Sequence, residues 1–263
     1  MISFDTIEPA FVKQFDEVDA FFTLRNEHLF GSSGLASSLK KTENFSDENA
    51  DILIEDDVNI RRSELFSILD LDPLKTAWAD QVHGNNVKNV EEGGLYDNVD
   101  GLITRKPGFA LITQVADCAA LLMYNPEARI IAAVHAGWRG AVAGIIPNTV
   151  KAIEQIGGEP TQTYAFLGPC ISQEHFEVGD EVAIQFPDRF VDRTSYSKPH
   201  VNLKQFIATQ LREGGLPEEH IEIHPKCTFK DKNQLYSYRR ENDKSGRMLA
   251  VIRLREDGNA HES

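Results

Sequence analysis

Two histidines and one cysteine have the side chains that most often hold a catalytic metal ion in an enzyme. They are His83, Cys118 and His135. Imidazole nitrogens and thiolate sulfurs suit zinc and related metals, and three protein ligands leave a fourth position for water or substrate. The three residues are far apart in the sequence, so only the tertiary structure can bring them together. Residue types therefore suggest a catalytic zinc site, although their spacing alone does not establish it.

The same residues allow a second chemistry, in which cysteine is the nucleophile. His135 would draw the proton from Cys118 and leave a thiolate. Asp117 precedes the cysteine within an apolar stretch, where an unpaired buried carboxylate is costly. It therefore needs a partner, a backbone turn or a function. We take Cys118, His135 and Asp117 as the candidate catalytic residues, with the metal site and the dyad both open.

The residues that follow His135 contain groups suited to substrate binding. An apolar run ends at His135, and a small-residue turn follows, which is where α/β enzymes often place reactive groups. Trp138 offers a stacking surface and Arg139 an anion site. Phe176 is a candidate for lining a pocket.

Cys170 and the remaining histidines are weaker candidates. Cys170 follows a glycine and a proline in a constrained turn, and it is either a reactive thiol or a packed one. The other six histidines lie in polar stretches, which indicates mostly surface positions: His28, His175, His200, His220, His224 and His261.

Apolar periodicity predicts strands and helices that are interspersed without regular βαβ units. The expected strands are 109–115, 119–124, 129–135 and 248–254, and the expected helices are 57–71, 142–156 and 201–213. Pro147 either kinks the second helix or opens another one at its first turn, and Asn202 caps the third. No glycine-rich phosphate loop follows a strand. We predict a mixed α/β or α+β fold, with helices covering one or two sheets.

The composition narrows the class of protein. The 263 residues can bury a substantial core, and the net charge of −14 argues against nucleic acid and anionic membranes as partners. Residues 31–51 are expected to form a surface loop and 256–263 a flexible tail. With three widely separated cysteines and no visible signal peptide or membrane-spanning run, we expect a cytoplasmic protein, either a monomer or a weak dimer.

Several motifs together resemble one bacterial family, described as laccase-like polyphenol oxidases, as purine nucleoside phosphorylases and as a peptidoglycan editing factor. The matching pieces run in order along the chain: AFFTLR (20–25), QVHGNNV (81–87), DGLIT (100–104), ADCAALLMYNPEARIIAAVHAGWRG (116–140), LGPCISQEHFEVGDEV (167–182) and YSYRRENDKSGRMLAVIRL (236–254). The sequence departs from the family pattern at 26–28 and 38–40. A change there would alter substrate preference if these residues shape the mouth of the pocket.

The resemblance implies a single catalytic domain over 1–263, an α/β/β/α sandwich similar to the deamidase domain of the cytotoxic necrotizing factors. It also implies that His83, Cys118 and His135 are metal ligands, normally for zinc. The implied activities are phosphorolysis of adenosine, inosine and methylthioadenosine, with accompanying adenosine deamination. Zinc would activate a water for attack on the purine C6 in the deamination.

Phosphorolysis also needs a bound phosphate, whose oxygen attacks the ribose C1′. Arg139 and Arg239 are candidates to hold it, with Arg25 a third. Asp117 would orient a metal ligand or relay a proton.

Three other functions are alternatives to this one. The first is a cysteine hydrolase that uses the Cys118–His135 dyad on an amide of a cell-wall precursor. A copper-dependent polyphenol oxidase is disfavoured, because eight mostly scattered histidines and three methionines show no multicopper or blue-copper pattern. A non-enzymatic module that binds a partner protein is disfavoured by the concentration of catalytic residue types.

Overall fold

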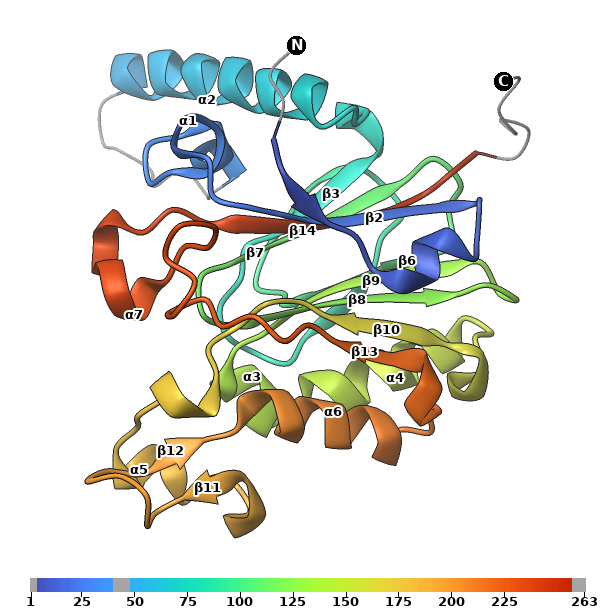
Figure 1. The fold of residues 1–263 in the computed structure, drawn as a ribbon. Helices are drawn as coiled ribbons and strands as arrows, with labels where there is room; N and C mark the ends of the chain where they lie inside the picture. The colour runs from blue at the N-terminus through green and yellow to red at the C-terminus, as the bar shows by residue number, and fades with distance from the viewer. Residues whose placement is uncertain (1–3, 40–47, 257–263) are drawn as a thin grey trace.

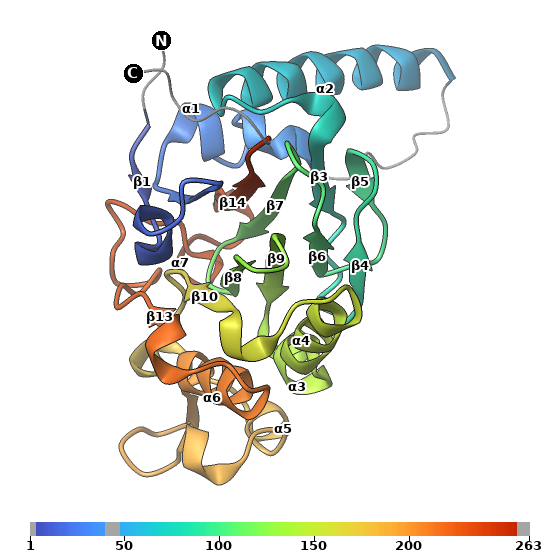
Figure 2. The same cartoon turned by 90° about the vertical axis from the view of Figure 1, so that its right-hand side faces the viewer.

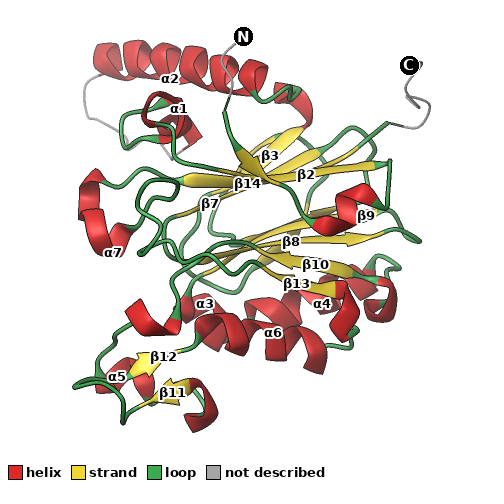
Figure 3. Ribbon diagram, viewed as in Figure 1, coloured by secondary structure: helices red, strands yellow, loops and turns green. Residues whose placement is uncertain are grey.

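The computed structural model describes residues 4–39 and 48–256, apart from the side chains of 48–57. The described residues form four layers in the order helix, sheet, sheet, helix (Figure 1 and Figure 3). The predicted α/β/β/α sandwich, a single domain of the mixed α/β class, is confirmed. No described helix combines the length and the apolar character needed to cross a membrane.

The first sheet has six strands in the order β1-β2-β14-β7-β3-β5. Their bounds are Thr6–Ile7 for β1, Val18–Thr23 for β2, Met248–Leu254 for β14, Ala110–Val115 for β7, Thr76–Ala79 for β3 and Gly94–Tyr96 for β5. The C-terminal strand β14 is central and pairs antiparallel with both β2 and β7. The last motif of the sequence therefore lies beside a strand from the middle of the chain.

The second sheet also has six strands, in the order β13-β10-β8-β9-β6-β4. Their bounds are Ile221–Ile223 for β13, Tyr164–Leu167 for β10, Ala119–Asn125 for β8, Ile130–Ala136 for β9, Gly101–Thr104 for β6 and Val87–Asn89 for β4. β8 and β9 form an antiparallel pair in which Ala120 is opposite His135. A two-stranded sheet, β11 (Val191–Asp192) with β12 (His200–Val201), lies outside both layers.

Helices cover the outer face of each sheet, as two perpendicular views show (Figure 1 and Figure 2). α1 (Glu27–Phe30) and α2 (Glu48–Ile68) lie over the first sheet. The helices over the second sheet are α3 (Trp138–Ala143), α4 (Ile145–Gln155) and α6 (Leu203–Glu213). The two remaining short helices are α5 (Asp180–Ala183) and α7 (Tyr238–Glu241).

Strand β9 shows how one element serves two cores. Ala132 and Val134 pack with the helices below the second sheet, whereas Ile131 and Ala133 pack between the two sheets. Successive side chains of a strand point to opposite faces, which explains this alternation. His135 consequently faces the inter-sheet side, where its side chain is buried.

The predicted strands and the third helix are confirmed. The four strands correspond to β7, β8, β9 and β14, and no end differs by more than one residue. The Asn202 side chain caps α6 by accepting a hydrogen bond from the Gln205 N–H at 3.1 Å. Residue 201 belongs to β12 instead, so the helix starts two residues later than expected.

Of the two alternatives for 142–156, a single kinked helix is wrong, and a second helix with Pro147 in its first turn is confirmed. Gly144, with a φ of 94°, separates α3 from α4, and Pro147 lies in the first turn of α4. The predicted turn after His135 is also short, because α3 begins at Trp138. The glycine permits a left-handed break that other residues adopt only with strain.

The surface loop expected over 31–51 is wrong at 35–39 and 48–51, whereas 31–34 do form a turn. Residues 35–39 form a 3-10 helix in which Leu35 and Leu39 are buried, because these apolar side chains pack into the core below α2. Arg61 on α2 donates hydrogen bonds to the carbonyls of Ser33 and Gly34. Residues 48–51 belong to α2, whereas 40–47 lie outside the described residues.

The helix expected over 57–71 is α2, which begins earlier and ends at Ile68. A left-handed φ of 55° at Asp70 follows its end. Of the tail expected over 256–263, Glu256 pairs with Lys75, and 257–263 lie outside the described residues.

Candidate active site

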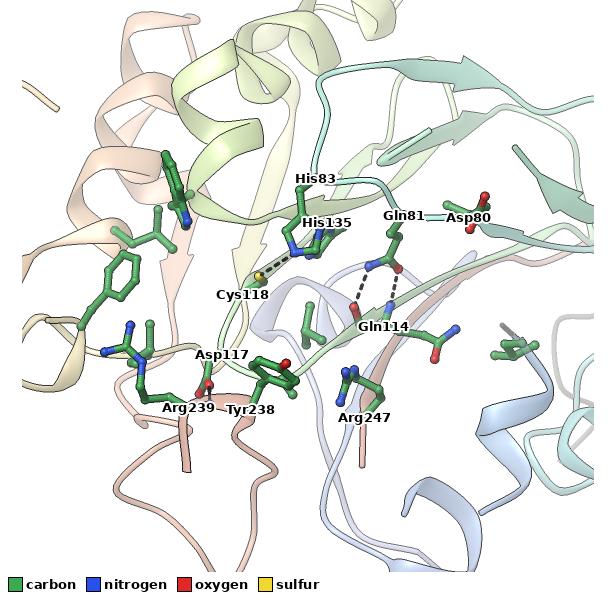
Figure 4. A pocket seen from close by; sticks show the side chains of 18 residues that line it. Asp80, Gln81, His83, Gln114, Asp117, Cys118, His135, Tyr238, Arg239 and Arg247 are labelled. Carbon is green, nitrogen blue, oxygen red and sulfur yellow. Dashed lines mark hydrogen bonds between the residues drawn. The ribbon is translucent and has the colours of Figure 1, made fainter. Parts of the chain in front are cut away.

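Two loops and one strand bring the three predicted ligands together (Figure 4). His83 lies in the loop after β3, Cys118 in the turn between β7 and β8, and His135 on β9. Their ligand atoms all lie within 4.8 Å of one another, and Cys118 Sγ is 3.8 Å from His83 Nε2. The antiparallel pairing of β8 with β9 places Cys118 beside His135, because Ala120 is already opposite that histidine.

A buried carboxylate, that of Asp100, fixes both histidines. Its Oδ1 lies 2.7 Å from His135 Nδ1, so the other ring nitrogen of His135 remains free to face Cys118. The same carboxylate accepts hydrogen bonds from the backbone N–H groups of Val82, His83 and Gly84, at 3.3, 3.0 and 2.7 Å. It thereby holds His83 in a left-handed conformation with a φ of 61°. Asp100 precedes β6 within the DGLIT motif, and the sequence reasoning assigned it no role.

Asp117 fixes the turn that carries Cys118. Its φ is 85°, a conformation that residues other than glycine rarely adopt. The carboxylate accepts hydrogen bonds from the Thr228 hydroxyl and the Arg239 backbone N–H, both at 2.6 Å. The backbone carbonyl of Asp117 accepts another from the Ile171 N–H at 3.0 Å. The carboxylate that the sequence left without a partner therefore ties two segments of the chain to the Cys118 turn, and the backbone carbonyl of Asp117 ties a third.

Two glycines of the HAGWRG motif provide space around the three side chains. A Cβ at Gly137 would lie 2.9 Å from the His83 ring and 3.1 Å from Cys118 Sγ. A Cβ at Gly140 would lie 2.5 Å from the Gly84 carbonyl oxygen. Backbone thus approaches backbone closely here, and a larger residue at 137 would enter the space that the ligand side chains share.

The electrostatics of the cluster favour a charged cysteine. Burial by itself raises the pKa of the Cys118 thiol, but His135 and His83 outweigh it and lower that pKa to about 6. Burial lowers the pKa of His135, but Cys118 and Asp100 outweigh it and raise that pKa to about 9. Burial also raises the pKa of Asp100, but its hydrogen bond with His135 leaves it below the ordinary value. Without a metal ion, the pair is a thiolate beside an imidazolium.

The cluster opens into a cavity of about 1050 Å³, large enough for a small organic substrate. Of the predicted substrate-binding residues, Trp138, Phe176 and Arg239 line it. The sequence reasoning did not identify its other polar or aromatic lining residues, which are Asp80, Gln81, Gln114, Tyr238 and Arg247. Gln81, Tyr238 and Arg247 do lie within the matched motifs, but no spacing rule distinguishes them from their neighbours.

Arg25 and Arg139 do not line this cavity. The guanidinium of Arg25 pairs with Glu27 at 2.7 Å and with Glu241 at 2.6 Å, so its charge is already balanced within the fold. The side chain of Arg139 is exposed and stacks over the Trp138 ring at 4.5 Å. The structure therefore does not join these two arginines to the cluster.

Cys170 and His200 are both buried. Burial raises the pKa of the Cys170 thiol to about 12, which favours the packed alternative over the reactive one. The surface position expected for His200 is wrong, because its ring stacks on Tyr196 and its Nδ1 lies 2.9 Å from the Gln173 carbonyl oxygen. His261 lies outside the described residues.

The donor set fits a metal ion. A tetrahedral zinc ion separates its nitrogen and sulfur ligands by about 3.5 Å, close to the distance between Cys118 Sγ and His83 Nε2. The hydrogen bond that His135 Nδ1 donates to the Asp100 carboxylate is typical of metal-ligating histidines. Met123 and Met248, the methionines among the described residues, both lie outside the cavity lining, so neither supplies the axial ligand of a blue-copper centre.

The fold and cluster define a class of protein, a four-layer sandwich with a candidate His-Cys-His metal centre that faces a cavity. Residues 19–255 match the family described as "Multi-copper polyphenol oxidoreductase laccase", and the chain belongs to this family.

Relatives of this chain are named for a different reaction from the one in the family description. A protein of Corynebacterium glutamicum named purine nucleoside phosphorylase is 32% identical over 73% of this chain and 80% of its own length. The purine nucleoside phosphorylase YlmD of Bacillus subtilis is 29% identical over 91% of this chain and 90% of its own. The solved structure of the hypothetical protein YfiH of Bacillus licheniformis superposes with a TM-score of 0.80 and 25% identity, covering 96% of this chain and 97% of the other.

Proposed function

We propose that the protein is a zinc-dependent purine nucleoside phosphorylase that also deaminates adenosine. The observation that carries the proposal is the His83, Cys118 and His135 cluster, which opens into a cavity with two arginines, Arg239 and Arg247. A nucleoside and an anionic co-substrate need such a combination of aromatic and cationic surfaces. The names of the relatives supply the substrate class.

The lining residues divide the work of such a reaction. Bound zinc would supply Lewis-acid chemistry at an open coordination position. Trp138, Phe176 and Tyr238 offer ring surfaces to the purine and ribose, while the two arginines supply positive charge for phosphate. In phosphorolysis a phosphate oxygen bonds to the ribose C1′ while the bond from C1′ to the purine nitrogen breaks. Asp117 acts as a positioning residue, because both of its carboxylate oxygens accept hydrogen bonds from neighbouring segments.

A second candidate, a cysteine hydrolase acting on an amide, is favoured by one specific observation. The pKa of Cys118 falls to about 6 and that of His135 rises to about 9, the charge arrangement of an activated cysteine nucleophile. Asp100 lies behind His135, where it would orient the imidazole as the third member of a triad does. His83 is not a member of this triad, although its imidazole also helps to lower the pKa of Cys118.

One experiment tests the proposed reaction directly. The protein is incubated with adenosine, with and without phosphate, and adenine, hypoxanthine and inosine are followed by chromatography. We expect phosphate-dependent release of free base with ribose 1-phosphate, and inosine that forms without phosphate. An inert protein with adenosine would contradict the proposal.

His83→Ala separates the two candidates. We expect this variant to lose bound metal and nucleoside turnover, because one of three ligands is gone. A His83→Ala protein that hydrolyses an amide substrate as well as the unmodified protein does would favour the dyad instead.

Metal analysis tests the cofactor. Protein purified without chelator should carry close to one zinc per chain. A metal-free protein that is fully active, or one that requires copper, would contradict the zinc assignment.

A further inference from the structure

Arg247 occupies an unusual position for an arginine in this molecule. Arg247 directly precedes β14. The first residue of β14, Met248, pairs with Val115 of β7. The Cys118 turn follows Val115 at the end of β7. Because β14 and β7 are paired, Arg247 lies at the same end of the sheet as this turn. Figure 4 shows its guanidinium directed into the cavity, between Tyr238 and Gln114.

The charge of Arg247 has no acidic partner among the described residues. Its Nη1 donates hydrogen bonds to the backbone carbonyls of Ser245 and Gly246, at 2.8 and 2.9 Å. Its guanidinium carbon lies 5.7 Å from the centre of the Tyr238 ring. These contacts fix one edge of the guanidinium, and the other nitrogens have no hydrogen-bond partner among the described residues.

Three other arginines show how this protein usually treats a partly buried guanidinium. Arg25 pairs with Glu241, and both Arg253 and Arg255 pair with Asp19. Burial lowers the pKa of Arg247, and the charges of Cys118, Tyr238, Asp117 and Asp243 offset this only in part. A desolvated cation that the fold does not neutralise is suited to an anion that arrives with the substrate.

Gln114 offers a neutral hydrogen-bonding group beside Arg247. The side chain of Gln81 holds the Gln114 backbone, accepting from its N–H and donating to its carbonyl, each at 2.8 Å. No hydrogen bond occupies the side-chain amide of Gln114 among the described residues, and that amide faces the cavity. Gln81 therefore acts as a clamp on the strand that presents Gln114.

We propose that Arg247, with the Gln114 amide beside it, forms the inner oxyanion-binding subsite of the cavity. The free edge of the guanidinium would donate two hydrogen bonds to an oxyanion, and the amide would donate a third. Identifying this anion as the inorganic phosphate of phosphorolysis rests on the function proposed above. The existence of the subsite rests on the geometry alone.

Arg239 plays a different part in this arrangement. Its side chain is exposed, its Nη1 donates to the Glu177 carbonyl at 2.9 Å, and its guanidinium lies over the Phe176 ring. It lies at the rim, where water screens its charge. Arg239 would attract anions to the cavity, whereas Arg247 would hold one there.

The test is phosphate binding by isothermal titration calorimetry with the metal-loaded protein. Arg247→Gln removes the charge, Arg247→Lys keeps it without the planar fork, and Arg105→Gln is a matched control at an exposed arginine outside the cavity. We expect phosphate affinity to fall about 10- to 100-fold in Arg247→Gln, by less in Arg247→Lys, and not at all in the control. In turnover, KM for phosphate should rise while KM for the nucleoside stays within about twofold.

Three results would overturn the subsite. They are a wild-type protein that binds no phosphate, an Arg247→Gln protein with the affinity of the control, and an equal loss of nucleoside and phosphate affinity. The last would show a structural role, and circular dichroism with metal content would confirm the cause. If phosphate binding depends on Arg247 but the wild-type protein releases no base from any purine nucleoside, the subsite stands and the proposed function fails.

Discussion

Two neighbouring turns of this protein each carry a cysteine, and their thiols have opposite properties. A hydrogen bond from the Ile171 N–H to the Asp117 carbonyl links the turn of Cys170 to the turn of Cys118. Burial raises the pKa of both thiols, because a thiolate loses the solvation of water. Only Cys118 faces two imidazoles, and its pKa falls to about 6 whereas that of Cys170 rises to about 12.

The surroundings, and not the residue type, decide which of the two cysteines can do chemistry. Cys170 is fully buried and its turn pairs with that of Cys227, whose Sγ accepts a hydrogen bond from the Ser172 N–H at 3.3 Å. Lys204 lowers the pKa of Cys170, but burial outweighs its effect. A thiol in such surroundings contributes packing, whereas Cys118 contributes a ligand or a nucleophile.

The largest expected difference is in alkylation. Chelator-treated protein is incubated with iodoacetamide between pH 4 and 10, and each cysteine is followed by mass spectrometry. A lowered pKa means that the Cys118 thiolate is present above about pH 6, so its rate should rise through pH 6 and then level off. At pH 7 it should exceed the rate of Cys170 by on the order of 10⁴-fold. Comparable rates for both cysteines in the folded protein would contradict the difference between their thiol pKa values.

Serine substitution should separate the two roles by function. Cys118→Ser should abolish metal binding and lower turnover by about 10³-fold or more, because a hydroxyl is a poor ligand for zinc. Cys170→Ser should retain its metal and lose about 1–3 kcal/mol of unfolding free energy, because it places a hydroxyl in an apolar site. Metal analysis and urea denaturation measure the two effects. Metal loss in the Cys170 variant would contradict the assignment.

Asp100→Asn should weaken the cluster without removing a ligand. The carboxylate accepts hydrogen bonds on both oxygens, and an amide offers only one acceptor. We expect zinc affinity to fall about 10- to 100-fold, measured by competition with a chromogenic chelator. Asp5→Asn, at an exposed position, is the matched control. Unchanged affinity in Asp100→Asn would show that His135 needs no such support.

The smallest expected effect comes from Thr228→Val. This change removes the hydroxyl that donates to Asp117, so the left-handed turn before Cys118 loses one of its restraints. We expect a loss of about 1 kcal/mol in unfolding free energy with the metal retained. Thermal denaturation beside Thr161→Val, an exposed control, measures it. Complete loss of metal would mean that the turn depends on this single hydroxyl.

The parts of the fold that follow from local patterns were predictable. The apolar runs of β7, β8, β9 and β14 marked those strands to within one residue, because burial on both faces leaves an uninterrupted apolar signal. The capping role of Asn202 at the start of α6 was equally predictable, because capping depends on neighbours in the sequence. The prediction of a loop over 31–51 was wrong because the many serines and lysines made the segment look polar. Two leucines within it, Leu35 and Leu39, nevertheless pack under α2.

The sequence by itself determined that His83, Cys118 and His135 carry side chains able to bind a metal ion, since residue type defines a donor, and the family motifs singled out these three. Only the tertiary structure decided which groups act on them. Asp100 reaches His135 across the pairing of β6 with β9, Thr228 reaches Asp117 from 111 residues away, and Arg247 enters the cavity from the last strand. The physical reason is that hydrogen bonds and charge interactions depend on distance in space, which sequence separation does not encode.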